Sequence, residues 1–236
     1  MSSEVAQSLS RCFQVLLNFF RVLIRRKLKS LPVWTIFLVM GCNMNVVVSS
    51  STELTQALNN AKGGDTIELA PGDYGSFNFN NLKFDSFVNI ISSDINNVAK
   101  FDLIQINNSQ HVRIDNVHVD YPSNPGISGK LVNIGGGSHH IEFINSEINA
   151  KVDGDFSGGR GISVSDAHDV LIENNYIHDV RDGGVFINVN NLEISENTIN
   201  DLQRDSFKFA SVQDVLIENN IGPRIVHPAN GEHIDF

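Results

Sequence analysis

The sequence of 236 residues predicts an all-β fold, a right-handed parallel β-helix whose coils stack as a solenoid. Three observations predict this class: a short phrase recurs along the chain, apolar and polar residues alternate within each copy, and no segment of helical periodicity separates the copies. The phrase IENN stands at 172–175 and at 217–220, and a weaker form, FINS, stands at 143–146. Recurrence at intervals of about 20–30 residues is typical of stacked supersecondary units.

The first apolar residue of each copy defines the period. These residues are Ile67, Val88, Val112, Ile141, Val170, Leu192 and Val215, at steps of 21, 24, 29, 29, 22 and 23 residues. A second apolar residue follows each of them two positions later, which indicates a half-buried strand. Four positions later most copies carry asparagine, at Asn116, Asn145, Asn174 and Asn219. Asparagine tolerates the left-handed backbone of a tight turn, and stacked amides can bond from one coil to the next.

A second strand precedes each copy, at 103–106, 161–164, 183–186, 206–209 and 233–236. Two or more short strands in each coil of about 22 residues describe a parallel β-helix. This second strand stands where a leucine-rich repeat would have its helix, and the absence of helical segments also argues against an α/β sheet. We therefore expect residues 50–236 to form one β-helix domain of about seven coils.

One short helix is expected within residues 50–64, where it would cap the first coil. Ser50 and Glu53 form a capping box, and Gly63 with Gly64 can end the helix. Its apolar face would consist of Leu54, Ala57, Leu58 and Ala61. The sequence stops at Phe236 within a predicted strand, so we expect a β-helix truncated at the C-terminus, whose uncapped last coil offers an edge for self-association.

Residues 1–49 are interpreted as a signal or membrane-targeting segment. Six basic residues (Arg11, Arg21, Arg25, Arg26, Lys27 and Lys29) precede an apolar run at 31–42, the order typical of an export signal. The protein is therefore expected to be exported to an extracellular, periplasmic or outer-surface location, and to meet a membrane only through this segment. LVMGC resembles a lipobox, so a lipid anchor at Cys42 stands beside simple cleavage and an uncleaved anchor as alternatives.

Composition limits the partners of the domain. The net charge of -10 argues against a nucleic-acid partner, because such binding draws most of its affinity from clustered lysine and arginine. Both cysteines, Cys12 and Cys42, precede residue 50. The expected domain therefore has no disulfide and depends on packing and hydrogen bonds.

The segment STELTQALNNAKGGDTIELAPGDYG, at 51–75, resembles the opening of pectate-lyase-like β-helix proteins, particularly chondroitinase-B-like alginate lyases. The later coils are similar to those of mannuronate epimerases. This resemblance, which covers about residues 50–236, implies an exported enzyme that acts on an acidic polysaccharide, often with calcium, through a Lys/Arg pair or a Tyr/His/Asp set. The Asp-Pro-His segment of the epimerases does not occur, and the catalytic region of the lyases would fall mostly beyond the last residue.

Two insertions mark the expected binding face. The 29-residue steps are about seven residues longer than the step of 22, and the extra residues fall at 121–130 and 151–160, after the asparagine turn. Insertions at the same place in adjacent coils should project side by side, as loops that build a binding face commonly do. Two plain surface loops are the alternative.

Charged residues stack ten and eleven positions before the copies, and from them we predict the site. Proton abstraction beside a uronate carboxyl group needs a base, an acid and positive charge. The predicted catalytic residues are Lys208, His233, Asp235 and Arg204, with substrate binding by Arg160, Arg181 and Lys151. Lys208 and Asp235 should face outward on adjacent coils, as should Ser163 and Val185. Asp182, Asp205 and Glu232 are predicted to hold calcium through oxygen ligands.

Two functions follow as hypotheses. The first is an exported lyase or epimerase acting on an acidic, uronate-containing polysaccharide, and the second is a non-catalytic glycan-binding or adhesive β-helix. The charged corner is also compatible with a solvated ion-pair ladder of little energetic value. His139, His140, His168 and His178 are interpreted as structural residues at repeat turns, and neither zinc spacing, a serine nucleophile motif nor a phosphate loop occurs.

Overall fold

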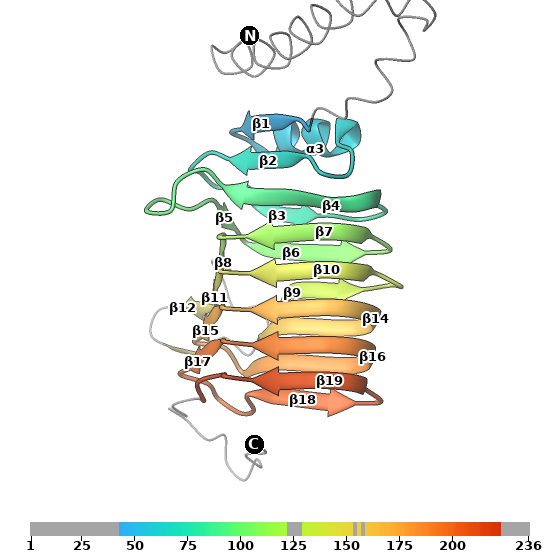
Figure 1. Ribbon diagram of the computed structural model, residues 1–236. Helices are drawn as coiled ribbons and strands as arrows, with labels where there is room; N and C mark the ends of the chain where they lie inside the picture. The colour runs from blue at the N-terminus through green and yellow to red at the C-terminus, as the bar shows by residue number, and fades with distance from the viewer. Residues whose placement is uncertain (1–42, 122–128, 153–154, 157–158, 223–236) are drawn as a thin grey trace, which may run out of the picture.

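The computed structural model describes residues 43–121, 129–152, 155–156 and 159–222. Within them the chain forms a stack of coils (Figure 1). Equivalent strands of consecutive coils pair in parallel. This arrangement confirms the predicted all-β fold of stacked parallel strands. The targeting segment predicted at 1–49 lies outside the described residues up to position 42. Among the residues described, no helix is long and apolar enough to cross a membrane.

Three strand faces enclose the core, and we call them face one, face two and face three. Face one consists of β3 (Ser76–Asn78), β6 (Leu103–Asn107), β9 (Lys130–Gly135), the first halves of β14 (Arg160–Glu173) and β16 (Asp182–Ser195), and β18 (Phe207–Ala210). Face two consists of β1 (Asn45–Val48), β2 (Thr66–Leu69), β4 (Lys83–Ser92), β7 (Gln110–Asp115), β10 (His139–Ile144), the second halves of β14 and β16, and β19 (Gln213–Glu218). Face three consists of β5 (Lys100–Phe101), β8 (His118–Asp120), β11 (Glu147–Asn149), β15 (Tyr176–His178) and β17 (Thr198–Asn200).

The strand register confirms most of the predicted period. Val88 pairs with Val112, and the later anchors pair in turn through Ile141, Val170, Leu192 and Val215. The first step is wrong, because Ile67 pairs with Ile90 and not with Val88. Apolar residues in a strand repeat every second position, so a shift of two residues keeps the same face buried and cannot be detected from alternation. The solenoid also begins before residue 50, since β1 pairs with β2 from Asn45 onward.

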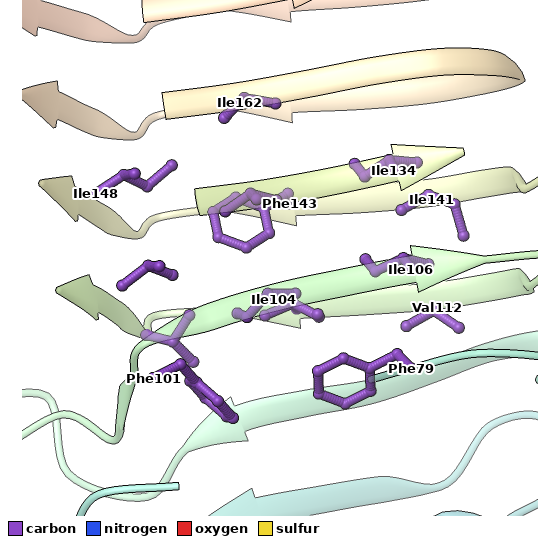
Figure 2. Packing of buried hydrophobic residues seen from close by; sticks show 14 of the residues in the cluster. Phe79, Phe101, Ile104, Ile106, Val112, Ile134, Ile141, Phe143, Ile148 and Ile162 are labelled. Carbon is purple, nitrogen blue, oxygen red and sulfur yellow. The ribbon is translucent and has the colours of Figure 1, made fainter. Parts of the chain in front are cut away.

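The core is a column of apolar side chains from the inner surfaces of the three faces. Ile106 and Ile134 are register partners on adjacent coils and are both fully buried. Figure 2 shows them one above the other, together with the buried side chains of Phe79, Phe101 and Phe143 on neighbouring coils. Because every coil buries its apolar residues against its neighbours, the stability of the stack comes from these repeated interfaces.

The asparagine turn joins face two to face three and contains two columns of amides. The predicted column has left-handed backbone at Asn116, Asn145, Asn174, Glu196 and Asn219, and Asn174 Nδ2 donates to Asn145 Oδ1 at 2.7 Å. The sequence reading missed a second column one residue later. There Asn175 Nδ2 donates to Asn197 Oδ1 at 3.0 Å, and Asn197 Nδ2 donates to Asn220 Oδ1 at 2.9 Å. Since Asn175 and Asn197 are buried, this inner column satisfies backbone groups that water cannot reach.

Helix α3 (Ser51–Asn60) lies beside β1 and β2 at one end of the stack (Figure 1). It buries Leu54, Ala57 and Leu58, as predicted for a cap on the first coil. The Ser50 side chain accepts from Glu53 N, but the Glu53 carboxylate accepts from Ser49 N at 2.7 Å and so closes the box one residue earlier than predicted. This backbone hydrogen bond lowers the pKa of Glu53. The helix ends at an extended Ala61, not at a glycine.

Candidate functional site at the face one corner

The two insertions connect face three to face one in consecutive coils. On the face three side, Asp120 pairs with Asn149, and on the face one side, Lys130 pairs with Arg160. Because both flanks are in register, the insertions leave and rejoin the stack side by side, as predicted. The second insertion contains a short antiparallel pair of strands, β12 (Lys151–Val152) and β13 (Asp155–Phe156). Residues 122–128, 153–154 and 157–158 lie outside the described residues.

Glycines bring the charged residues to this corner. An added Cβ at Gly161 would lie 2.7 Å from Gly183 O and 2.7 Å from Ile177 Cγ2, and one at Gly183 would lie 2.5 Å from Ser206 O. Real Cβ atoms do not approach so closely, so the beginnings of β14 and β16 can pack tightly against face three only because these positions are glycine. Arg160 and Asp182, which pair in register, immediately precede these two glycines.

Lys208 lies at the centre of the corner, between two buried carboxylates. Its Nζ lies 2.9 Å from Asp182 Oδ1 and 2.6 Å from Asp205 Oδ2. The side chains of the two aspartates are only 2% and 4% exposed, whereas that of Lys208 is 31% exposed. The solvated ion-pair ladder considered above therefore does not describe this corner, because its carboxylates are removed from water.

Two arginines complete the group, which we call the charged corner: Arg160, Asp182, Arg204, Asp205 and Lys208. Arg204 Nε lies 3.7 Å from Asp182 Oδ1, and its Nη2 lies 3.5 Å from Asp205 Oδ2. Arg160 Nε is buried and has no hydrogen-bond partner among the described residues. Three cationic side chains thus accompany two carboxylates, which leaves a local excess of positive charge in a protein whose net charge is -10. Such a local field attracts an anionic ligand.

The outer column of face one confirms the predicted direction of Lys208. Val185 pairs with both Ser163 and Lys208. Ile162 and Val164, which precede and follow Ser163 in β14, are fully buried in the core. Ser163 and Val185 are nevertheless only 3% and 6% exposed. Ser163 lies between Asn133 and Val185 in the register, and Val185 lies between Ser163 and Lys208.

The described residues do not by themselves form the predicted calcium site. Asp182 and Asp205 do come together, but the Lys208 ammonium lies between their oxygens. Calcium takes six to eight oxygen ligands, and a lysine cation in the same place competes with it. In the part of the chain that the structure describes, no group of three or more His, Cys, Asp or Glu side chains is arranged for a metal ion.

The structure leaves the predicted roles of several residues untested. Glu232, His233 and Asp235 lie outside the described residues, and so does the predicted pairing of Lys208 with Asp235. Lys151 lies in β12, where the backbone alone is described. Arg181 precedes the strand of the charged corner, and its backbone N–H donates to Gly159 O at 2.8 Å. The roles predicted for these residues stay predictions.

The sequence reading missed an ionisable group on face three, beside the insertions. His178 Nε2 lies 3.1 Å from Glu147 Oε1, and its Nδ1 lies 2.8 Å from Asp179 Oδ2. The Tyr176 ring stacks on His178 with centroids 4.2 Å apart, and His118 Nε2 lies 3.8 Å from the same Glu147 oxygen. His178 was assigned to a turn, but it is the last residue of β15. The alternation of Tyr176 and His178 around buried Ile177 is the signal that could have identified them.

Comparison with known proteins identifies the family. A model described as the right-handed beta helix region matches residues 102–224, just over half of the chain. The chain belongs to this family. No curated protein matches this β-helix chain.

Solved structures with a similar arrangement include an alginate lyase from Paenibacillus sp. str. FPU-7, at 16% identity and a TM-score of 0.36, covering 78% of this chain and 98% of that one. They also include the PL6 family alginate lyase AlyGC, at 14% identity and a TM-score of 0.35, covering 78% and 39%. The pectate lyase Pel9A matches at 11% identity and a TM-score of 0.34, covering 75% and 80%. At these values the similarity says nothing about activity.

Proposed function

We propose that this β-helix protein acts on an acidic, uronate-containing polysaccharide, as a lyase or an epimerase, at the charged corner of face one. The observation that carries the proposal is the position of the Lys208 ammonium, held by Asp182 and Asp205 and accompanied by Arg204, with Arg160 at the end of the second insertion in register with Asp182. A uronate carboxylate meets positive charge there, whereas the net charge of -10 disfavours it over the rest of the surface. Stacked coils also present their side chains at the regular spacing that a repeating chain can follow.

The corner suits chemistry that passes through an enolate. A base removes the proton from C5 of the sugar, and the electron pair moves toward the neighbouring carboxyl group, where positive charge stabilises it. In a lyase the pair then returns to form the C4–C5 double bond, the C4–O4 bond breaks, and the leaving oxygen takes a proton. In an epimerase the proton instead returns to C5 from the opposite side.

Each described residue of the corner receives a role in this scheme. Arg160 and Arg204 neutralise the sugar carboxylate, and Arg160 Nε is a buried donor with no partner among the described residues. Lys208 Nζ, which lies within hydrogen-bond distance of both carboxylates, is the proposed donor of the proton to the leaving oxygen or to C5. Asp182 and Asp205 position Lys208. His233 and Asp235 remain the proposed bases. Calcium binding by Glu232 with Asp182 and Asp205 is a separate proposal and would require displacement of Lys208 from between the two carboxylates.

The test incubates the complete protein with mannuronan, guluronan, polygalacturonate and chondroitin sulfate. A lyase produces the ultraviolet absorbance of an unsaturated uronate, and an epimerase exchanges the C5 proton with deuterium from the solvent without that absorbance. Parallel reactions with a calcium chelator test the proposed metal. Neither signal on any polymer would contradict the enzymatic proposal.

A non-catalytic glycan-binding protein is the second candidate. Lys208 favours it in one respect, because an ammonium bound to Asp182 and Asp205 can attract a uronate carboxylate without transferring a proton. Retention of one of these polymers on the protein, with no absorbance and no exchange, would support this candidate. Export is proposed with either function, and fractionation of the producing cells tests it.

A further inference from the structure

Four histidines lie at the corner between face one and face two, on three consecutive coils. His111 belongs to β7, His139 and His140 to β10, and His168 to β14. None of them takes part in the proposed function. We call these four residues the histidine corner.

Left-handed backbone places neighbouring side chains on the same side of the chain here. In an extended strand, consecutive side chains point to opposite faces. His111, His140 and Asp169 have positive φ, at 55°, 52° and 53°, which breaks that alternation. As a result His139 Nδ1 lies 2.8 Å from His140 Nδ1, and His168 Nδ1 lies 2.8 Å from Asp169 Oδ2.

The parallel register then stacks the rings across coils. His139 pairs with His168, and their rings are almost parallel, at 5°, with centroids 4.7 Å apart. His111 and His140 stack in the same way at 4.6 Å and 28°. Neutral imidazoles attract one another in such stacks, whereas two protonated rings at this separation repel.

The charged and titratable groups that face His139 come from each element packed against it. They are Lys83 of β4, His111 of β7, His140 of its own strand, and His168 with Asp169 of β14. Burial lowers the pKa of His139, and His168, His140, Lys83 and His111 lower it further. Hydrogen bonds from Asn191 and His168 lower the pKa of Asp169, so this carboxylate stays ionised beside His168 and His140.

We propose that the histidine corner is an acid-sensitive contact. Its stacked rings stabilise the packing of three consecutive coils while they are neutral, and this packing weakens when the rings are protonated. The rings are open to solvent, since the side chains of His140 and His168 are 44% and 48% exposed. Two surface hollows of about 350 and 360 Å³ flank them, one lined by His168 and Asp166, the other by His140 and Asp169. Protons reach the stack without any opening of the fold.

The direction of the pH effect follows from His139. Its pKa in the folded protein is lowered from 6.5, so between the two values the unfolded chain binds more protons than the folded one. Stability therefore falls as pH decreases through 6.5 and continues to fall to the lowered folded value. This inference rests on the fold and not on the proposed activity.

The experiment compares pH dependence in matched variants of the full chain, with a chelator present to exclude metal binding by imidazole. Urea midpoints are measured from about pH 7.5 to about pH 5 for the wild type, His139→Gln and His168→Gln, with His118→Gln on face three as the control. We expect the midpoint of the wild type and of His118→Gln to fall with acid, and those of the two corner variants to fall less. Equal falls in all four proteins would overturn the proposal.

Amide hydrogen exchange supplies a readout that does not depend on how well a variant folds. In the wild type, protection at 139–141 and 168–170, corrected for intrinsic exchange, should decrease between about pH 7 and about pH 5.5 more than protection at 192–195. A uniform decrease along the stack, or none, would contradict a contact located at this corner.

Discussion

The charged corner and the histidine corner are built by the same device and behave in opposite ways. Both stack ionisable side chains on consecutive coils, about 4.8 Å apart, because the parallel register brings equivalent positions together. At the charged corner the register partners Arg160 and Asp182 carry opposite charge, and Lys208 of the following coil lies between Asp182 and Asp205. At the histidine corner the stacked groups are alike, with His139 stacked on His168. A β-helix thus fixes which residues meet, and the sequence decides whether their meeting is attractive.

The two corners also differ in how deeply their charged or titratable side chains are buried. The aspartate side chains of the charged corner are 2% and 4% exposed, so salt screens their pairing with Lys208 only weakly. At the histidine corner the side chains of His140 and His168 are 44% and 48% exposed, and the pKa of His139 is lowered by burial and by the neighbouring cationic and imidazole groups. The first corner is therefore a permanent feature of the folded protein and the second a conditional one.

The largest effect on stability is expected for Lys208→Ala. Removal of the ammonium leaves Asp182 and Asp205 buried without their shared partner, and loss of one member of a buried ion pair costs about 3 kcal/mol. An outward-facing lysine, as the sequence predicts for Lys208, would by itself contribute little to folding. Urea unfolding at neutral pH measures the loss, with Lys208→Arg as the charge-retaining control. A loss below about 1 kcal/mol would show that water reaches the carboxylates.

A smaller effect on stability is expected for His139→Glu, and its dependence on pH should be opposite to that of the wild type. This substitution places a carboxylate among Lys83, His140 and His168 and so gives the histidine corner the opposite charges of the other corner. We expect the variant to gain stability relative to the wild type as pH falls from about 7.5 to about 6, by about 1 kcal/mol or less at this partly exposed position. Paired urea titrations at the two pH values measure it. A relative loss on acidification would mean that ring stacking, not charge, controls the corner.

The smallest effect is expected on face two, where Arg113 pairs with Glu142 of the next coil. Like the charged corner, this pair joins opposite charges, but the Arg113 side chain is 38% exposed. A double-mutant cycle with Arg113→Ala and Glu142→Ala should give a coupling of about 0.5 kcal/mol that decreases with added salt. A coupling as large as the loss in Lys208→Ala would show that burial does not separate the two kinds of pair.

The sequence revealed the fold because alternation and period repeat in every coil. Val112, Ile141, Val170, Leu192 and Val215 were identified as equivalent positions, and the structure pairs them. Where the repeat is weak, as at Ile67, alternation alone does not distinguish between two registers that differ by two residues. The outward direction of Lys208 was predicted, but its partners were not, because they depend on where a flexible side chain turns at a corner.

Other features of the sites have no signature in the period. Asn175 and Asn197 adjoin the predicted asparagine column, and only the backbone of the turn decides which of the two amides lies inside. The clustering of His139, His140 and His168 depends on positive φ at His140, which breaks the alternation from which strand directions were inferred. The residues proposed as bases, His233 and Asp235, lie outside the described residues.

The central claim, that the charged corner acts on an acidic polysaccharide, is tested most directly by the activity of Lys208→Arg in the complete protein. Arginine keeps the positive charge between Asp182 and Asp205 but cannot release a proton near neutral pH. The assay follows unsaturated product and C5 deuterium exchange on the polymer that the wild type accepts, with Arg113→Lys on face two as the matched control. We expect Lys208→Arg to lose at least about 100-fold in turnover with unchanged polymer binding, and the control to retain its activity. Full activity of a folded Lys208→Arg would contradict the claim that this corner carries the proton transfer.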